Sequence, residues 1–274
     1  MAILPLLLGG SIAAASLPPS APATAAAPRH PALWVVNDDD TIIYLFGTFH
    51  ALDGRSSWFE QAVATAFFAS DELMLETLVP KPGAPLPTGF GTQRSSQAPA
   101  PGASVAQLAP SASYLATTKV VMNAGRSQGL STDNGADAVL REVADEYGKP
   151  VGGLESFQYQ LRMFNSLPSA GAQPPQDAKA VGALADMLSS LEAAWSRGDI
   201  ENTFSPLLVQ MQAQSPQTYK IMFEQRNARW AQWIANRLKT PGTVFVAVGA
   251  GHLSGPDSVQ KQLASIGVKS ARIN

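Results

Sequence analysis

The sequence of 274 residues contains no cysteine. This absence excludes disulfide bonds, thiolate metal ligands and a cysteine nucleophile. Charge is also scarce, because charged residues make up 15% of the chain and the formal net charge is −2 at pH 7. So little excess charge offers no basic surface for nucleic acid or for an anionic membrane. We therefore expect no nucleic-acid partner.

Long hydrophobic runs are missing after residue 30. Nothing there approaches the roughly 20 apolar residues that a membrane-spanning helix needs. Residues 1–30 join a short apolar stretch to a leader rich in Ala and Pro, and small residues offer cleavage positions, but a basic n-region is lacking. This pattern predicts a secretory signal peptide, with a disordered tail or membrane anchor as the alternative. We accordingly expect a secreted or periplasmic protein.

What is present after the leader is typical of a globular domain. Hydrophobic residues make up 45% of the chain, enough for a substantial core. Residues 31–274 are predicted to form a single domain. A segment rich in Pro, Gly and Ser at residues 79–104 indicates a loop, and residues 167–179 are a shorter segment of the same kind.

Short apolar runs alternate with stretches of helical periodicity. The runs are expected to be strands, and they begin at residues 41, 72, 151, 243 and 268. Ser57 and Glu60 have the spacing of a capping box, which predicts a helix capped by Ser57. A helical insertion is expected at about residues 156–240. Strands separated by helices predict an α/β fold with a small, mainly parallel sheet and a helical bundle.

Four of the expected strands end at a residue that can bind a metal ion or transfer a proton. These residues are His50, Glu76, Glu155 and His252. In an open α/β sheet, ligands bind beyond the carboxyl ends of the strands. Two imidazoles and two carboxylates suit either a divalent metal ion or a general acid–base pair.

Both of these histidines follow a glycine by three positions, in the segments Gly47–His50 and Gly249–His252. The chain has only three histidines, so the repetition is unlike a chance arrangement. Gly47 and Gly249 would let the backbone turn tightly or approach a ligand closely. We expect the two segments to form the halves of one split site.

A helical stretch before the second motif carries two further candidates. Asn227 lies on an otherwise apolar stripe at helical spacing, where a polar side chain is unusual. Arg226 beside it could supply a fixed positive charge for an oxyanion or a carboxylate. The alternative is an exposed arginine next to a surface asparagine.

Together these segments resemble the TraB/GumN family, which includes the TIKI proteases. The resemblance rests on the two G-x-x-H motifs, on Glu76 after the first motif, and on Arg226 and Asn227 before the second. It implies a fold similar to erythromycin esterase-like and haem-uptake lipoprotein domains. For TIKI-like members it also implies a peptidase that depends on a divalent metal ion, with manganese or cobalt proposed.

The leading hypothesis is a metal-dependent hydrolase that cleaves a peptide or another small substrate in a cleft. His50 and His252 would bind a divalent Mn, Co or Zn ion, with Glu76 as third ligand or as base. Arg226 and Asn227 would stabilise the developing oxyanion, and Glu155 would support them.

Two alternatives stay open at the level of the sequence. The first is an esterase-like hydrolase without metal, in which a histidine and Glu76 act as general acid and base. The second is a non-catalytic binding protein for haem or for a polysaccharide-assembly partner.

Overall fold

The protein is described from a computed structural model that covers residues 30–55, 57–79, 112–168 and 177–274. Three segments singled out in the sequence fall largely outside these ranges. They are the expected signal peptide and leader, nearly all of the Pro-rich segment 79–104, and the middle of segment 167–179.

Among the described residues, the strands form one sheet in the order β4-β3-β5-β2-β1-β6. β2 and β3 both pair in parallel with β5, and β4 pairs in parallel with β3. β1 pairs antiparallel with β2 and with β6, so the sheet is mixed at one edge. The predicted α/β fold is confirmed, and the parallel strands are those that were expected to carry the site. The strands span Leu33–Asn37 (β1), Thr41–Thr48 (β2), Glu72–Thr77 (β3), Val151–Glu155 (β4), Gly242–Gly249 (β5) and Ala271–Arg272 (β6).

Strand β1 was absent from the order of elements inferred from the sequence. It forms a hairpin with β2 through a turn at residues 38–40. The Asp38 carboxylate accepts a hydrogen bond from the Thr41 amide at 3.0 Å, and the Asp38 amide donates to the Thr41 carbonyl at 3.1 Å. An aspartate is well suited to this position because its side chain bonds to backbone a few residues further on.

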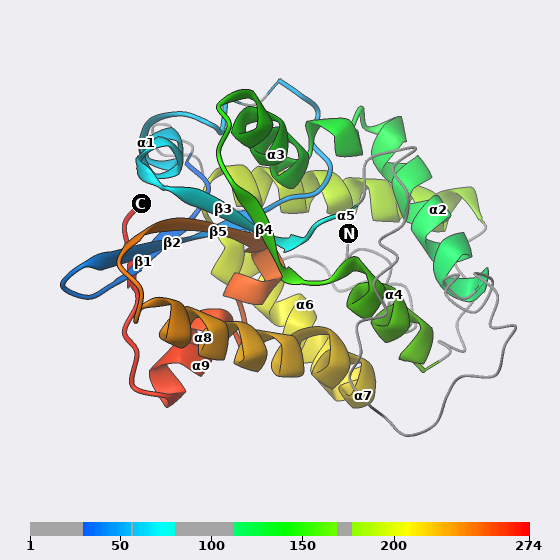
Figure 1. Cartoon of the computed structure of the whole chain (residues 1–274). Coiled ribbons are helices and arrows are strands. Elements are labelled where there is room, and N and C mark those ends of the chain that lie inside the picture. The colour runs from blue at the N-terminus through cyan, green and yellow to red at the C-terminus, as the bar shows by residue number, and fades with distance from the viewer. Residues whose placement is uncertain (1–29, 56, 80–111, 169–176) are drawn as a thin grey trace, which may run out of the picture.

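Helices cover both faces of the sheet (Figure 1). α1 and α3 lie on one face, and α8 and α9 lie on the other. Helices α4 to α8 come between β4 and β5 in the chain. Within the described part of the chain, no helix is both long enough and apolar enough to cross a membrane. The helices are α1 (Gln61–Ala69), α2 (Ala112–Ser127), η3 (Thr132–Asn134), α3 (Ala136–Glu146), α4 (Phe157–Ser166), α5 (Ala178–Ser196), α6 (Ile200–Gln214), α7 (Pro216–Tyr219), the π-helix η4 (Lys220–Glu224), α8 (Gln225–Arg237), η5 (Ala250–Leu253) and α9 (Val259–Ser265).

The start of α1 differs from the prediction. Its first residue is Gln61 and its N-cap is Glu60, without a side-chain capping bond, so the prediction of a cap at Ser57 was wrong. Trp58 explains the difference, because its ring stacks on Phe46 at 5.6 Å and meets Trp195 at 5.8 Å. Burying an indole contributes more free energy than one capping bond, so this segment packs on the core instead of starting the helix.

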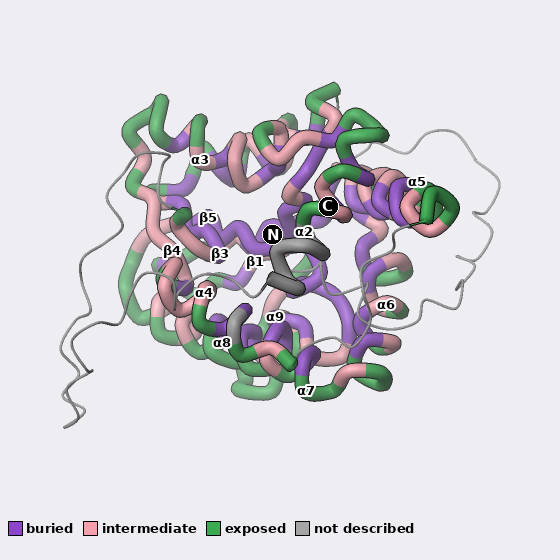
Figure 2. Tube along the Cα trace, turned by 90° about the vertical axis from the view of Figure 1, so that its right-hand side faces the viewer, coloured by how far each residue is buried: buried purple, intermediate pink, exposed green. Residues whose placement is uncertain are grey.

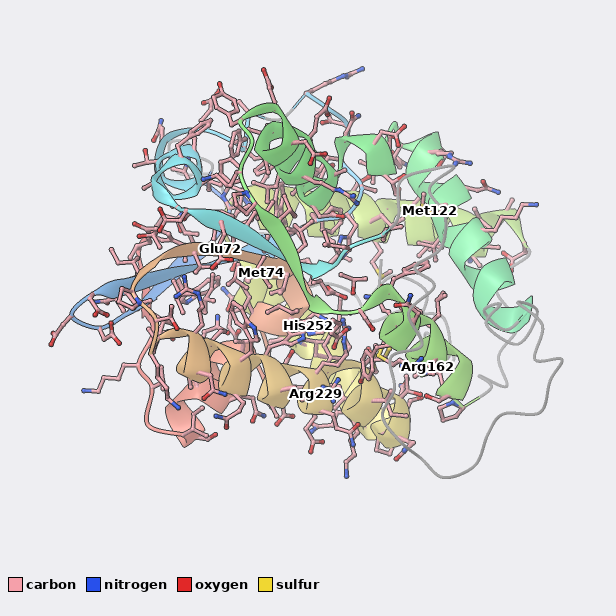
Figure 3. All side chains as sticks on the ribbon, in the orientation of Figure 1. Glu72, Met74, Met122, Arg162, Arg229 and His252 are labelled. Carbon is pink, nitrogen blue, oxygen red and sulfur yellow. The ribbon has the colours of Figure 1, made fainter. Side chains whose placement is uncertain are left out.

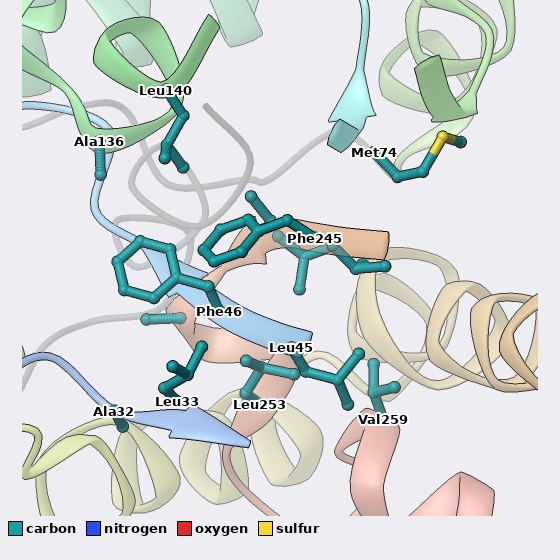
Figure 4. Close-up of a cluster of buried hydrophobic side chains, with 14 of the residues drawn as sticks. Ala32, Leu33, Leu45, Phe46, Met74, Ala136, Leu140, Phe245, Leu253 and Val259 are labelled. Atoms are coloured by element: carbon teal, nitrogen blue, oxygen red, sulfur yellow. The ribbon is translucent and has the colours of Figure 1, made fainter. Parts of the chain in front are cut away.

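The main hydrophobic core lies between the sheet and the helices on its two faces. The burial pattern in Figure 2 follows this arrangement, with buried segments along the central strands. Figure 4 shows part of the core, where Phe46 and Phe245 lie side by side; their ring centroids are 5.7 Å apart. Each such side chain contributes about 1.5–3 kcal/mol when fully buried. This packing fixes the ends of β2 and β5, from which the two G-x-x-H histidines extend.

The approach of α3 to the end of β2 depends on Gly135. A β-carbon at this position would lie 2.3 Å from the His50 carbonyl oxygen and 2.7 Å from the His50 carbonyl carbon. We expect Gly135→Ala to push α3 away from β2 and to lower the free energy of unfolding by about 1–3 kcal/mol. Thermal unfolding measures this loss.

Gly182→Ala provides the matched control for Gly135→Ala. Gly182 lies in α5, and a β-carbon there would meet nothing within 4 Å. The control variant should gain about 0.5–1 kcal/mol from the better helix propensity of alanine. Equal melting temperatures for the two variants would contradict the close packing at Gly135.

Candidate functional site

The predicted site residues that end strands lie at the carboxyl edge of the sheet, and Arg226 and Asn227 reach them from α8. Thr48 pairs with Gly249, and Thr77 pairs with Glu155, so the neighbouring parallel strands end at one level. The chain leaves this edge at each strand end, which is where an α/β sheet binds its ligands.

Residues distant in sequence meet at one point beside Gly249. We call the region bordered by these side chains, beyond the position that a β-carbon on Gly249 would occupy, the convergence point. The β-carbon position lies 3.2 Å from His50 Nε2, 3.6 Å from Glu76 Oε2 and 3.7 Å from His252 Cδ2. Since Gly249 has φ −51°, the backbone itself would accept other residues. The glycine therefore keeps space open between the three side chains.

His50 is held by an aspartate that the sequence analysis did not single out. His50 Nδ1 lies 2.8 Å from Asp137 Oδ1, in the first turn of α3. Burial alone would raise the pKa of Asp137, but the His50 ring and its hydrogen bond hold this pKa below its usual value. An ionised Asp137 can only accept, so Nδ1 carries the proton. In the neutral form of the ring, the lone pair then lies on Nε2, and this atom is buried and has no hydrogen-bond partner in the described structure.

Arg226 is the centre of the buried charges. Its side chain is fully buried, and its Nη2 lies 2.5 Å from Glu76 Oε1 and 2.8 Å from Glu155 Oε2. Nε donates to both Glu155 oxygens, and Nη1 lies 3.3 Å from the Met222 carbonyl oxygen. Nη1 also lies 3.2 Å from His252 Nε2. All five N–H donors of the guanidinium thus have an acceptor.

The local helix geometry brings Arg226 into this position. Arg226 is the second residue of α8, and α8 directly follows the π-helix at Lys220–Glu224. A π-helix widens the turn locally and often occurs at functional sites. The guanidinium carbon lies 4.7 Å from the Trp230 ring centroid, a cation–π contact that further fixes its plane.

Glu76 is held as a carboxylate. Burial alone would raise the pKa of Glu76, but the neighbouring Arg226 guanidinium holds it well below its usual range. Gln160 on α4 donates to Oε1 at 3.0 Å, and the Gly249 amide donates to Oε2 at 3.3 Å. These donors stabilise the charged form and set the direction of Oε2.

His252 is neutral and oriented on both sides of its ring. Burial and then the nearby Arg226 charge lower the pKa of His252 well below its usual value. Asn227 Nδ2 donates to the Asp257 carbonyl oxygen at 2.7 Å, so its Oδ1 accepts from His252 Nδ1 at 2.6 Å. His252 Nε2 then accepts from Arg226. In Figure 3, His252 lies between the sheet and helix α8. Arg229, also labelled there, is a residue of α8.

The predicted ligand set for a metal ion is only partly formed. The unpartnered His50 Nε2 and the Glu76 carboxylate oxygen Oε2 both face the convergence point, and such N and O donors suit a divalent ion. His252 Nε2 is turned to Arg226 instead. Within the described residues, no three His, Asp or Glu side chains form a group that could hold a metal ion. His252 could serve as a ligand only after its bond to Arg226 breaks.

The structure thus brings together the residues that the sequence predicted, while their roles stay predictions. Arg226 and Asn227 contact His252 and are not surface residues. Two residues of the site were missed, Asp137 and Gln160. An acidic residue in the first turn of a helix usually complements the helix dipole, so Asp137 carried no separate signal. Gln160 gave no signal, because one polar residue on a helix is ordinary.

The protein is thus an α/β protein whose candidate site is divided between strand ends that are far apart in the sequence. The profile of the TraB/PrgY/gumN family matches residues 32–88 and 91–272, and the chain belongs to this family. This membership confirms the resemblance inferred from the two G-x-x-H motifs.

Curated relatives are similar over part of their length. The uncharacterized protein YbaP of Escherichia coli (strain K12) is 32% identical over 154 residues, which is 53% of this chain and 54% of that protein. YbaP of Shigella flexneri matches with the same identity and the same coverage. The chain therefore spans about half the length of the curated relatives it matches. No solved structure matches it.

Proposed function

We propose that the protein is a hydrolase of a peptide or another small substrate, with His50 and Glu76 at the reacting centre and a divalent metal ion as cofactor. We further propose that residues 1–30 direct it out of the cytoplasm as a signal peptide. The observation that carries the catalytic part is the buried, unpartnered Nε2 of His50 beside Glu76 Oε2 at the convergence point.

The Nε2 atom of His50 supports a role for this residue as a metal ligand or as a general base. Asp137 fixes the proton on Nδ1, so that Nε2 keeps its lone pair pointing to the convergence point. Carboxylate–histidine pairs of this kind orient metal-binding histidines and catalytic bases alike. A purely structural histidine would instead be expected to use both nitrogens in hydrogen bonds.

The hydrogen bonds around Glu76 support a role for its Oε2 atom as a fixed hydrogen-bond acceptor or metal ligand at the convergence point. Arg226 and Gln160 donate to Oε1, and in the described part of the chain the Gly249 amide is the one donor to Oε2, at 3.3 Å. His50 Nε2 and Glu76 Oε2 would hold the metal ion. When bound, a divalent ion supplies a Lewis acid that polarises a scissile carbonyl group.

A metal-independent hydrolase is the second candidate, and the orientation of His252 favours it. Because His252 Nε2 accepts from Arg226, only two of the three expected ligands face the convergence point. In this case His50, oriented by Asp137, takes the proton of the attacking water as general base.

Metal content and hydrolysis, measured together, separate the two candidates. We expect the purified protein to bind about one Mn, Co or Zn ion per chain, to lose it in His50→Ala and Glu76→Gln, and to lose peptide hydrolysis on chelation. Hydrolysis that survives chelation but not His50→Ala would favour the second candidate. Equal metal content in wild type and both variants would place any ion elsewhere.

Gly249→Ala tests the space at the convergence point. The new methyl group would lie 3.2 Å from His50 Nε2, at a backbone conformation that alanine accepts. We expect hydrolysis to fall by roughly 100-fold, because displacing a reacting group by about 1 Å has this effect. The melting temperature should change little. Gly182→Ala is again the control, and wild-type rates for Gly249→Ala would refute the assignment of this space.

A further inference from the structure

Two threonine hydroxyls at the carboxyl edge of the sheet have no partner in the described structure. They are Thr48 Oγ1 at the end of β2 and Thr77 Oγ1 at the end of β3, and both atoms are buried. Thr48 as a whole is 2% exposed. Buried hydroxyls normally find a hydrogen-bond acceptor, so two unpartnered ones at one edge need an explanation.

The order of the sheet places Thr48 and Thr77 at the ends of β2 and β3, the two strands that flank β5. Thr48 pairs directly with Gly249 across β2 and β5. On the other side, β3 pairs with β5 as far as Leu75 and Ala247, and Thr77 is the last residue of β3, two residues further on. Paired residues of neighbouring parallel strands point to the same side of the sheet, and so do residues two apart on one strand. Thr48 and Thr77 therefore face the side of the sheet to which a β-carbon on Gly249 would point.

Within the described residues, three of the unpartnered buried polar atoms thus lie at or just after the ends of β2 and β3, on the two sides of the end of β5. His50 Nε2 is an acceptor, and the hydroxyls of Thr48 and Thr77 can each donate one hydrogen bond and accept others. This combination matches a small polar group with both donors and acceptors, such as a water molecule. An apolar ligand would leave all three unsatisfied.

We propose that Thr48 and Thr77 are catalytic residues that hold the attacking water of the hydrolysis at the convergence point. The inference rests on the proposed hydrolase function in its metal-independent form, in which His50 Nε2 stays free to accept a hydrogen bond. The hydroxyls orient the water so that its oxygen adds to the substrate carbonyl carbon. Its proton passes to one of the two acceptors at the same point, His50 Nε2 or Glu76 Oε2. The proton then moves to the leaving group as the bond between that group and the carbonyl carbon breaks.

The test uses variants that remove each hydroxyl while keeping the shape of the side chain. Thr48→Val and Thr77→Val should each lower kcat by about 10–100-fold, since the water loses its orientation. KM should stay unchanged. The melting temperature should be kept or raised, because no existing hydrogen bond is lost. Thr48→Ser, which retains the hydroxyl, should recover most of the activity.

Thr41→Val is the matched control at the opposite end of the same strand. Thr41 is also buried, but its hydroxyl bonds to the carbonyl oxygens of Leu238 and Thr240. This variant should lower the melting temperature and leave kcat unchanged. The opposite pattern, a stability loss and normal kcat in Thr48→Val, would overturn the proposal.

A crystal structure of the wild-type protein gives a readout that is independent of activity. We expect an ordered solvent oxygen within hydrogen-bonding distance of Thr48 Oγ1 and His50 Nε2, and its loss in Thr48→Val. Absence of this oxygen in the wild type overturns the inference. A wild-type protein that hydrolyses no substrate overturns the proposed function instead, so the two failures are distinguishable.

Discussion

Arg226→Met should lower the free energy of unfolding by about 3–5 kcal/mol, the largest loss that we expect from any substitution in the site. Methionine keeps an unbranched chain but removes the charge, so Glu76 and Glu155 would remain buried without their shared cation. For a chain of this length the melting temperature should fall by about 6–20 °C. Chemical and thermal unfolding followed by circular dichroism measure both quantities.

Arg229→Met is the control because Arg229 contacts the same carboxylate from the surface. Its side chain is 46% exposed and lies 3.4 Å from Glu155 Oε1. An exposed pair of this kind contributes less than about 1 kcal/mol. Adding Glu76→Gln and Glu155→Gln to Arg226→Met should recover part of the stability. If both arginine variants were equally stable, the buried charges would not depend on Arg226.

The largest effect on activity is expected for His50→Ala. Removal of Nε2 takes away an imidazole nitrogen that has no partner among the described residues, so hydrolysis should fall by roughly 10²–10⁴-fold. The side chain is partly exposed, and within the described residues its one hydrogen bond is to Asp137, so the stability should change by no more than about 1 kcal/mol. Steady-state kinetics and thermal unfolding on the same preparation measure both effects.

Asp137→Asn extends this experiment to the partner of His50. Loss of the carboxylate should lower hydrolysis or metal affinity by about 10–100-fold, less than loss of the histidine itself. Asp133→Asn, an exposed aspartate just before α3, is the control and should behave as wild type. Wild-type hydrolysis by His50→Ala would remove the histidine from the mechanism.

The strand ends could be predicted because parallel strands impose a simple rule. Apolar runs that end at His50, Glu76 and Glu155 show the carboxyl edge of a sheet directly, and adjacent parallel strands must end at that edge. Asn227 could also be predicted, since a polar residue on an apolar stripe of a helix needs a buried partner.

Other features of the fold and the site could not be predicted, because they depend on contacts between residues that are distant in the sequence. The pairing of Asp137 with His50 arises only when Gly135 allows α3 to approach β2. The engagement of His252 Nε2 by Arg226 depends on the π-helix that precedes α8. Trp58 displaced the expected helix start because its indole found a place between Phe46 and Trp195. Strand β1 was missed although its turn residues, 38–40, were visible in the sequence.

The saturated guanidinium of Arg226 also constrains how this site can change over generations. Glu76 and Glu155 share Nη2 of this one cation and His252 bonds to its Nη1, so none of these contacts can be replaced independently. Any single substitution on the route to another chemistry leaves a buried carboxylate or an N–H group without its counterpart. Arg226, Glu76, Glu155 and His252 are therefore expected to change together or not at all. The other residues around the convergence point can be substituted more easily.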